Sequence, residues 1–366
     1  MSKLLTIIVP CFLRKLGIKR LLDSIDPALA DVILIDDGSK EVNVFPYLDN
    51  DLLPYLYELS HNYSNVKVLT KEHSGIYNTR VMGTDFVKTP YFMFVDSDDR
   101  IVSKNVQKLC QNMNDNDCDM GIGRLYFKMC GFGMCSRKKW TECVHSFQKD
   151  IDIEQILNVF HNKIFSTKMI PVLKEMPHNT TIFEDTAPVF LTSLSANNIF
   201  ISHDIIHNYL FRTDNLSFFS SLAKSDNQLG IQDLYTMFLD GKKYAIEKGF
   251  FPTFKLQYES MFIRLFLQRI KATYNSKVLP KDQKERLVNQ ILNLMTSLIP
   301  NWQQNSYYLA GFSKCELNDI YNSWKANQIL KTNEYYKKKE FLISKEDPEI
   351  YFEKYKNILE EVKRSK

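Results

Sequence analysis

The stretch that decides the fold is YFMFVDSDDR, at residues 91–100. Its first half, Tyr91–Val95, is a continuous apolar run, and its second half holds the three carboxylates of Asp96, Asp98 and Asp99. A short run that is apolar on both faces is typical of a buried strand in a parallel sheet. Because carboxylates repel one another and are poor strand formers, three of them directly after such a strand indicate either an acidic turn or a metal site.

Three earlier segments repeat this pattern of a short apolar run with a distinct end. Leu4–Val9 is closed by Pro10, Val32–Ile35 is followed by acidic residues and a glycine, and Val66–Leu69 is the third run. Strand-like and helix-like segments in alternation predict an α/β doubly wound domain. The helix-compatible segments between the runs are Ile18–Ile25, the region around Leu52–Leu59, and Ile76–Phe86.

The pattern changes after Arg100 and again near residue 225, beyond which strand signals almost cease. Apolar residues then repeat at helical spacing from Tyr258 to Phe266 and from Leu287 to Leu298, the second series lying between Pro280 and Pro300. We therefore expect a domain at residues 1–224 and an all-helical domain at 225–366. Between Arg100 and residue 225 we expect a helix at Lys104–Met113, strands at Met120–Phe127 and Trp140–Phe147, a helix at Ile153–Phe160 and a mixed segment at Asp204–Phe211.

Composition and charge exclude several classes of protein. With 44% hydrophobic and 25% charged residues, the chain has the composition of a soluble globular protein. A net charge of +4 is too small for a dedicated nucleic-acid binder, although the basic excess lies in residues 225–366, where it suits anionic lipid headgroups or phosphates. The seven cysteines lack the paired spacing of a zinc site, and neither a signal-peptide pattern nor a membrane-spanning apolar run is present. We expect a cytoplasmic protein that at most lies on a membrane surface.

The acidic strand ends are where we expect the chemistry, because ligands of open parallel sheets bind beyond the carboxyl ends of the strands. Asp36 and Asp37 follow the second strand as the three later carboxylates follow the fourth. So much negative charge in one cleft requires hydrogen-bond donors or a hard cation with oxygen ligands, such as Mg²⁺ or Mn²⁺. Neither the Gly-rich dinucleotide fingerprint nor the P-loop pattern occurs, which disfavours Rossmann dinucleotide binding and P-loop hydrolysis.

Five stretches make the first part of the chain, roughly residues 3–220, resemble the inverting glycosyltransferases of family 2, which have the GT-A fold. Each stretch alone is a weak signal, but their order and spacing together are specific. The stretches are LTIIVPCF (5–12), ILIDDGSK (33–40), KEHSGIYNTRVMG (71–83), PYFMFVDSDD (90–99) and IFEDTAPVF (182–190).

The resemblance implies that the strand ends bind a nucleotide sugar. Asp36, with Asp37 beside it, would accept a hydrogen bond from the nucleobase edge, and Phe12 would stack on the base. Asp96 would contact the ribose or the metal, and Asp98 would bind the metal that bridges to the diphosphate. The further positions implied to contact the donor are Pro10, Gly75, Arg80, Ser97 and Arg212, and His207 is implied as an additional metal or phosphate contact.

The resemblance also implies a catalytic pair, Glu184 and Asp185, in which Asp185 is the general base. A neighbouring like charge or partial burial raises the pKa of a carboxylate and makes it a better base, although a helix N-terminus opposes this rise. Capping of a helix by Asp185 is the alternative, because Asp is favoured at that position for structural reasons alone.

Other positions leave alternatives open. Three asparagines common in the family are replaced here by Leu13, His73 and Val81, which leaves recognition of the base and sugar undecided. The alternative for Arg80 is a position on the surface of a helix, where it would pair with Asp85 or Glu72. Asn162 and Lys163 are candidates to face the acceptor, but a lysine on a helix surface is the simpler interpretation of Lys163.

Taken together, we expect an inverting, metal-dependent enzyme that moves a sugar from a UDP-linked donor to a hydroxyl of a bacterial surface glycan. Capsule, lipopolysaccharide, teichoic acid and glycoprotein glycans are all candidate acceptors, and a lipid-linked acceptor would place the enzyme at the inner face of the cell membrane. The helical domain would recognise the acceptor, form a homodimer or contact the membrane. The alternatives are a sugar nucleotidyltransferase, which would normally carry a Gly-rich loop after the first strand, and an inactive binding module of the same fold.

Overall fold

The computed structural model of this chain describes residues 3–39, 52–129, 132–135, 141–146, 159–176, 184–211, 228–275 and 279–311. The chain divides into two compact units, Met1–Ser217 with Thr236–Lys248, and Phe218–Tyr235 with Gly249–Lys366. The expected domain boundary at residue 224 lies outside the described residues.

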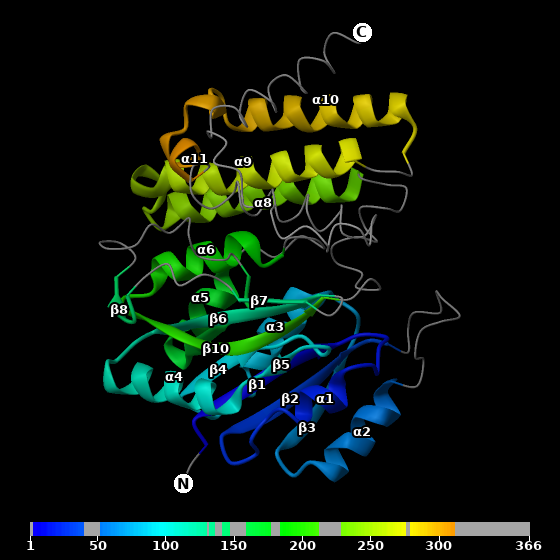
Figure 1. Cartoon of the computed structure of the whole chain (residues 1–366), viewed down its shortest axis with the longest axis vertical. Coiled ribbons are helices and arrows are strands. Elements are labelled where there is room, and N and C mark those ends of the chain that lie inside the picture. The colour runs from blue at the N-terminus through cyan, green and yellow to red at the C-terminus, as the bar shows by residue number, and fades with distance from the viewer. Residues whose placement is uncertain are drawn as a thin grey trace. The chain divides into compact units, whose positions relative to one another are not determined.

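The first unit is built on one ten-stranded mixed sheet (Figure 1). Its first four strands are parallel, so that their carboxyl ends lie at the same edge of the sheet. Further along the sheet, β9 runs antiparallel to both β4 and β6. The strands lie in the order β3 (Val66–Lys71), β2 (Ala30–Asp37), β1 (Leu5–Cys11), β4 (Tyr91–Phe94), β9 (Lys163–Ser166), β6 (Met120–Met129), β10 (Ile199–Phe211) and β5 (Arg100–Ile101), while β7 (Phe132–Cys135) pairs with β6 and β8 (Cys143–His145) with β10.

Alternation of side chains along β1 explains how helices cover both faces of the sheet. Leu5, Ile7 and Val9 belong to one buried cluster with apolar residues of α1 (Ile18–Leu22), α2 (Leu52–Asn62) and α4 (Ser103–Asp115). Ile8 faces the other side and meets Gly83 of α3 (Ile76–Thr84). The other described helices within Met1–Ser217 are α5 (Ile170–Glu175), which follows the short η2 (Thr167–Met169), and α6 (Thr186–Ser195).

The described elements of the second unit are helical, as the spacing of apolar residues predicts. Tyr258, Phe262 and Phe266 are buried along α9 (Phe251–Asn275), which is kinked at Phe254. The helix α10 (Lys281–Leu298) starts directly after Pro280 and ends at Leu298, two residues before Pro300, as expected for a helix bounded by two prolines. The other described elements are η4 (Trp302–Gln304), α11 (Ser306–Gly311) and α8 (Gln228–Glu247), whose two parts belong to different units.

The fold class is confirmed, and so are the first four strands and the helix at Lys104–Met113. The segment expected to be mixed, Asp204–Phe211, is wholly strand and forms the second half of β10. The expected helix at Ile153–Phe160 lies largely outside the described residues, and β9 is a strand that the sequence analysis did not predict.

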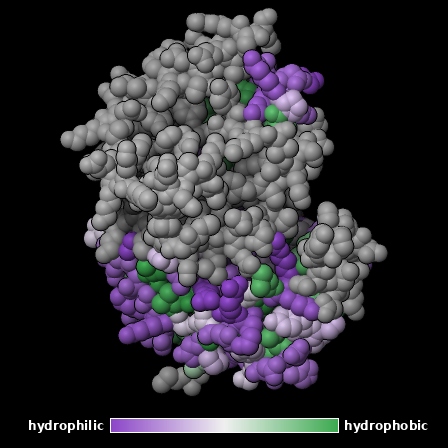
Figure 2. Space-filling view, turned by 45° about the vertical axis from the view of Figure 1, so that its right-hand side comes forward, coloured by the Kyte–Doolittle hydropathy of each residue, from purple (hydrophilic) through white to green (hydrophobic). Residues whose placement is uncertain are grey.

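None of the described helices is both long and apolar enough to cross a membrane. On the face shown in Figure 2, the described surface is mainly hydrophilic, with small apolar areas scattered over it. Large exposed apolar side chains of the described residues are few and spread over several elements, among them Leu16, Tyr57 and Ile246.

Candidate active site

The end of β2 is tied to the loop after β3 by the carboxylate of Asp37. This carboxylate accepts hydrogen bonds from Lys71 Nζ at 2.6 Å, from the Ser74 amide at 3.0 Å and from the Gly75 amide at 3.0 Å. Burial favours a higher pKa for Asp37, but the hydrogen bonds from Lys71 and Ser74 outweigh it and lower the pKa below its ordinary value. Asp37 therefore holds the loop that leads into α3.

Asp36 is buried beside it and is bound more loosely. Its Oδ1 accepts from the Ser39 amide and its Oδ2 from the Thr70 hydroxyl, both at 3.3 Å. Gly38, between Asp37 and Ser39 in the chain, has φ 73°. A Cβ there would lie 2.5 Å from the backbone nitrogen of His73, so only glycine fits this turn. Asp36 keeps acceptor capacity, since a carboxylate can accept about four hydrogen bonds.

Phe12, predicted to stack on a base, stacks on the ring of His73, with ring centroids 4.4 Å apart and planes 21° from parallel. His73 also lies 3.0 Å from Asp37, which links this aromatic pair to the loop. Pro10 is buried within β1, opposite Ile35, and Gly75 has φ 89° at the N-terminus of α3.

Arg80 lies in α3 with only 3% of its side chain exposed. Its Nη1 donates to Glu184 Oε1 at 2.9 Å, and its Nη2 donates to Asp96 Oδ1 at 2.8 Å. The alternative of a surface residue that pairs with Asp85 or Glu72 is wrong, because Arg80 is buried and forms its ion pairs with Asp96 and Glu184. Arg80 joins the end of β4 to the predicted catalytic pair.

The three carboxylates of the acidic turn after β4, at residues 96–99, have different surroundings. Asp96 is half-buried, and Arg80 keeps its pKa below the ordinary value although burial acts in the opposite direction. Asp98 and Ser97 are also half-buried, and burial together with the charges of Asp99 and Asp96 raises the pKa of Asp98 to about 7. The crowding of negative charge around Asp98 is the situation that a bound cation relieves.

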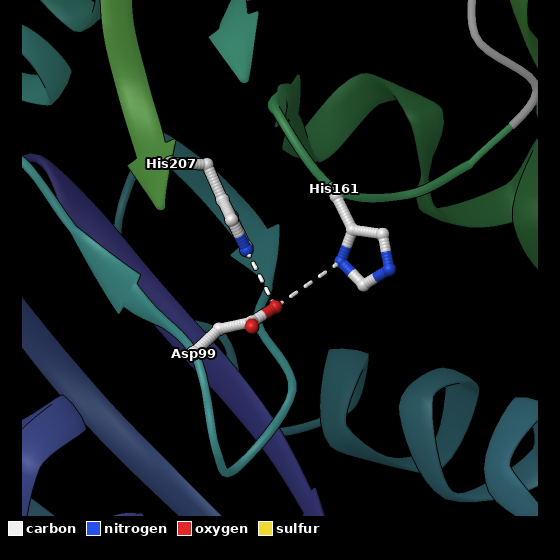
Figure 3. A group of neighbouring side chains, drawn as sticks. All are labelled: Asp99, His161 and His207. Carbon is white, nitrogen blue, oxygen red and sulfur yellow. Dashed lines mark hydrogen bonds and ion pairs between the residues drawn. The ribbon is translucent and has the colours of Figure 1, made fainter. Parts of the chain in front are cut away.

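Asp99 is buried between two imidazoles, His207 from β10 and His161 from the segment before β9 (Figure 3). Asp99 Oδ2 lies 2.8 Å from His207 Nε2 and 3.7 Å from His161 Nδ1. Burial lowers the pKa of His161, which favours the neutral imidazole that metals bind. No role was predicted from the sequence for either His161 or Asp99.

Potential ligand atoms of Asp99, His161 and His207 all lie within 4.8 Å of one another. Two imidazole nitrogens and one carboxylate suit Mn²⁺ or Zn²⁺ better than Mg²⁺, which prefers oxygen ligands. The predicted metal contact His207 therefore belongs to a group that could hold a metal, but in the described part of the chain its carboxylate neighbour is Asp99 rather than the predicted Asp98 or Asp96.

The predicted catalytic pair, Glu184 and Asp185, precedes α6, and its two members differ in their surroundings. Glu184 is paired with Arg80, whereas the Asp185 side chain makes no capping hydrogen bond although Asp185 occupies the N-cap position. Burial and the charge of Glu184 raise the pKa of Asp185 to about 8, with Arg80 opposing the rise. Asp185 is thus a half-buried carboxylate with the basicity that a general base needs.

The interpretation of Lys163 as a lysine on a helix surface is wrong. It lies on β9 rather than on a helix surface, its side chain is fully buried, and its Nζ donates to the Val159 carbonyl at 2.7 Å. Burial lowers the pKa of Lys163 to about 7, with the charge of Asp185 acting against this. Arg212, predicted near the diphosphate, lies outside the described residues.

Known glycosyltransferases are similar to parts of this chain in sequence. A processive diacylglycerol beta-glycosyltransferase of Mycoplasma genitalium is 25% identical over 239 residues, which are 59% of this chain and 66% of that protein. Glycosyltransferase GlyG of Streptococcus pneumoniae serotype 4 is 28% identical over 138 residues, 34% of this chain and 40% of that protein, so the matches span less than two thirds of either relative.

The fold is shared with a crystal structure of S. aureus TarS 1–349 in complex with UDP-GlcNAc. The TM-score is 0.51 at 16% identity, and the match covers 85% of this chain and 80% of that chain. The family model described as glycosyl transferase family 2 matches residues 6–171, which include the ends of β1, β2 and β4. Residues 6–171 of this chain are thus similar to glycosyl transferase family 2.

Proposed function

We propose that this protein is an inverting glycosyltransferase that moves a sugar from a UDP-linked donor to a hydroxyl group of an acceptor. The observation that carries the proposal is the placement of Asp185, a carboxylate whose pKa is raised. Asp185 directly follows Glu184, and Arg80 links Glu184 to Asp96 in the acidic turn after β4. A basic carboxylate beside a site for a charged leaving group is what displacement of a nucleoside diphosphate by a hydroxyl requires.

The donor would bind at the carboxyl ends of β1, β2 and β4. Asp36 has unused acceptor capacity for the N–H of a uracil ring, and the Phe12–His73 pair offers an aromatic surface beside it. A UDP-linked donor is further supported by the shared fold of TarS, whose structure contains UDP-GlcNAc. Asp96, Ser97, Gly75 and Pro10 would complete the donor site, with Arg212 near the diphosphate.

The metal would be held by Asp98 of the acidic turn together with Asp99, His161 and His207, and this donor set favours Mn²⁺ over Mg²⁺. When bound, a divalent ion supplies positive charge to a departing diphosphate. The raised pKa of Asp98 supports this assignment, because a nearby cation would stabilise its charged form.

Asp185 would accept the proton of the attacking hydroxyl. Glu184 is occupied by Arg80, so the two adjacent carboxylates have different tasks. Attack from the side opposite the leaving diphosphate inverts the anomeric centre, and the carboxylate that takes the proton lies on the side of attack.

The acceptor we propose is a hydroxyl of a bacterial surface glycan, free or linked to lipid, at the inner face of the cell membrane. The relative named for diacylglycerol glycosylation supports an acceptor associated with a membrane. The helical second unit would then contribute acceptor recognition, dimerisation or membrane contact.

A screen of UDP-, GDP- and dTDP-sugars with Mn²⁺, which measures release of the nucleoside diphosphate, tests this function. We expect hydrolysis or transfer with a UDP-sugar, loss of turnover in Asp185→Asn with nearly unchanged UDP binding, and full activity in the control Asp31→Asn, whose carboxylate pairs with Lys3 away from the site. If the wild-type chain neither binds nor cleaves any nucleotide sugar, the proposal is wrong.

A further inference from the structure

We propose that Arg80 is a positioning residue: it fixes the acidic turn after β4 and the Glu184–Asp185 pair to each other, and by engaging Glu184 it leaves Asp185 as the base. This inference rests on the proposed function and adds a role for a residue that was expected to contact the nucleotide. It predicts that Arg80 acts through two carboxylates rather than by direct binding of the donor.

The guanidinium bridges two segments that are far apart in the chain. Glu184 is 104 positions and Asp96 is 16 positions from Arg80, and each accepts one hydrogen bond from a different terminal nitrogen, at 2.9 and 2.8 Å. A planar fork with a nitrogen for each carboxylate fixes their relative orientation, which a lysine ammonium does not.

The remaining surface of the Arg80 side chain is also enclosed. The Phe160 ring lies against it, with its centroid 5.3 Å from Cζ. The buried Nε has no hydrogen-bond partner among the described residues, and an unsatisfied buried donor costs about 1–3 kcal/mol. A buried arginine that leaves one donor unsatisfied is better explained by the geometry it imposes on the two carboxylates than by a gain in stability.

Both partners of Arg80 lead to groups of the site. The second oxygen of Asp96, Oδ2, lies 3.7 Å from His161 Nε2, so the orientation imposed on Asp96 extends to the group drawn in Figure 3. Glu184 directly precedes Asp185, and the Asp185 carboxylate makes no capping bond of its own. The positive charge of Arg80 also restrains the rise in the pKa of Asp185 that burial and Glu184 cause.

A double-mutant cycle with Arg80→Lys, Glu184→Gln and the double variant tests this role. We expect Arg80→Lys to lower kcat by about tenfold to a hundredfold, as small displacements of catalytic groups do, with a change of less than about threefold in UDP affinity. In the Glu184→Gln background, the same substitution should have a much smaller effect on kcat, because the charge of Glu184 and with it the ion pair to Arg80 are already lost. Arg20→Lys, on the exposed side of α1, is the matched control and should leave kcat unchanged.

The pH dependence separates positioning from a purely structural role. Arg80→Gln, which removes the charge, should move the acidic limb of the kcat/KM profile to higher pH, and Arg80→Lys should restore part of that shift. Additive effects on kcat together with an unmoved profile would overturn the inference, as would a loss of UDP affinity that is the same in both backgrounds. Absence of turnover in the wild-type chain would instead contradict the proposed function, and with it the catalytic role inferred for Arg80.

Discussion

Asp185 has surroundings that set the pH at which it can act as a base. Because burial and Glu184 raise its pKa to about 8, the carboxylate is largely protonated at neutral pH. We therefore expect kcat/KM to rise with pH between about 7 and 9 and to level off above that range. A pH–rate profile with saturating metal measures this, and a profile that is flat or falls across the interval would show that another group is the base.

The same raised pKa has a consequence for stability. The folded state binds the proton of Asp185 more tightly than the unfolded chain, so this group lowers the free energy of unfolding as pH rises from about 4 to about 8. Below about pH 4, this group no longer lowers the free energy of unfolding, because it is protonated in both states. Asp185→Asn should therefore be more stable than the wild type at pH 8 and similar to it near pH 4.

Urea unfolding at both pH values measures this difference, with Asp31→Asn as the control whose carboxylate is paired at the surface. A destabilised Asp185→Asn at pH 8 would mean that the carboxylate stabilises the fold, which would favour the alternative of a structural cap.

At the scale of elements, the close packing of α3 on the sheet determines where Arg80 lies. A Cβ on Gly83 would lie 2.4 Å from Cγ2 of Ile8 in β1 and 2.9 Å from Cδ1 of Ile35 in β2. Gly83→Ala should therefore destabilise the protein by about 1–3 kcal/mol, although alanine is the better helix former. It should also lower kcat, because α3 must move away from the sheet and carries Arg80 with it.

Thermal unfolding and turnover measure the two effects of Gly83→Ala. Val81→Ala, on a half-buried position of the same helix, is the control and should change kcat much less. A Gly83→Ala variant with wild-type stability and turnover would show that α3 is not held at this contact.

Elements with a regular local pattern were predictable from the sequence, and elements defined by distant contacts were not. The first four strands carry apolar runs of their own, and α9 and α10 carry a helical repeat. By contrast, β9 has only four residues and begins with Lys163, whose burial is supported by the Val159 carbonyl and by Asn162. Nothing in a run this short distinguishes a buried strand from a loop, so a surface lysine was the natural interpretation.

In the candidate site, the types of residue were predictable from the sequence, but their interaction partners were not. The carboxylates at the strand ends were predictable as a group, because their positions follow directly from the strands. Their individual tasks depend on residues that are remote in sequence: Lys71 occupies Asp37 across 34 positions, and His207 approaches Asp99 across 108. His161 carries no local signal at all, since only the folded sheet brings it to Asp99.

At the scale of the whole molecule, the candidate donor site belongs to one unit. Every predicted site residue that the structure describes lies within Met1–Ser217, while α9 and α10 belong to the other unit. UDP with Mn²⁺ should therefore slow amide hydrogen exchange at residues 36–39, 71–75 and 96–99, with little change in α9 and α10.

Bound nucleotide should also raise the free energy of unfolding, by about 2.7 kcal/mol at a hundredfold excess over Kd. ADP with Mn²⁺ serves as the control, because it presents the same diphosphate but cannot offer the uracil N–H to Asp36. Equal protection by ADP would show that the diphosphate alone is recognised. Protection confined to α9 and α10 would place nucleotide binding outside the strand ends and would contradict the proposed donor site, since those helices hold none of its residues.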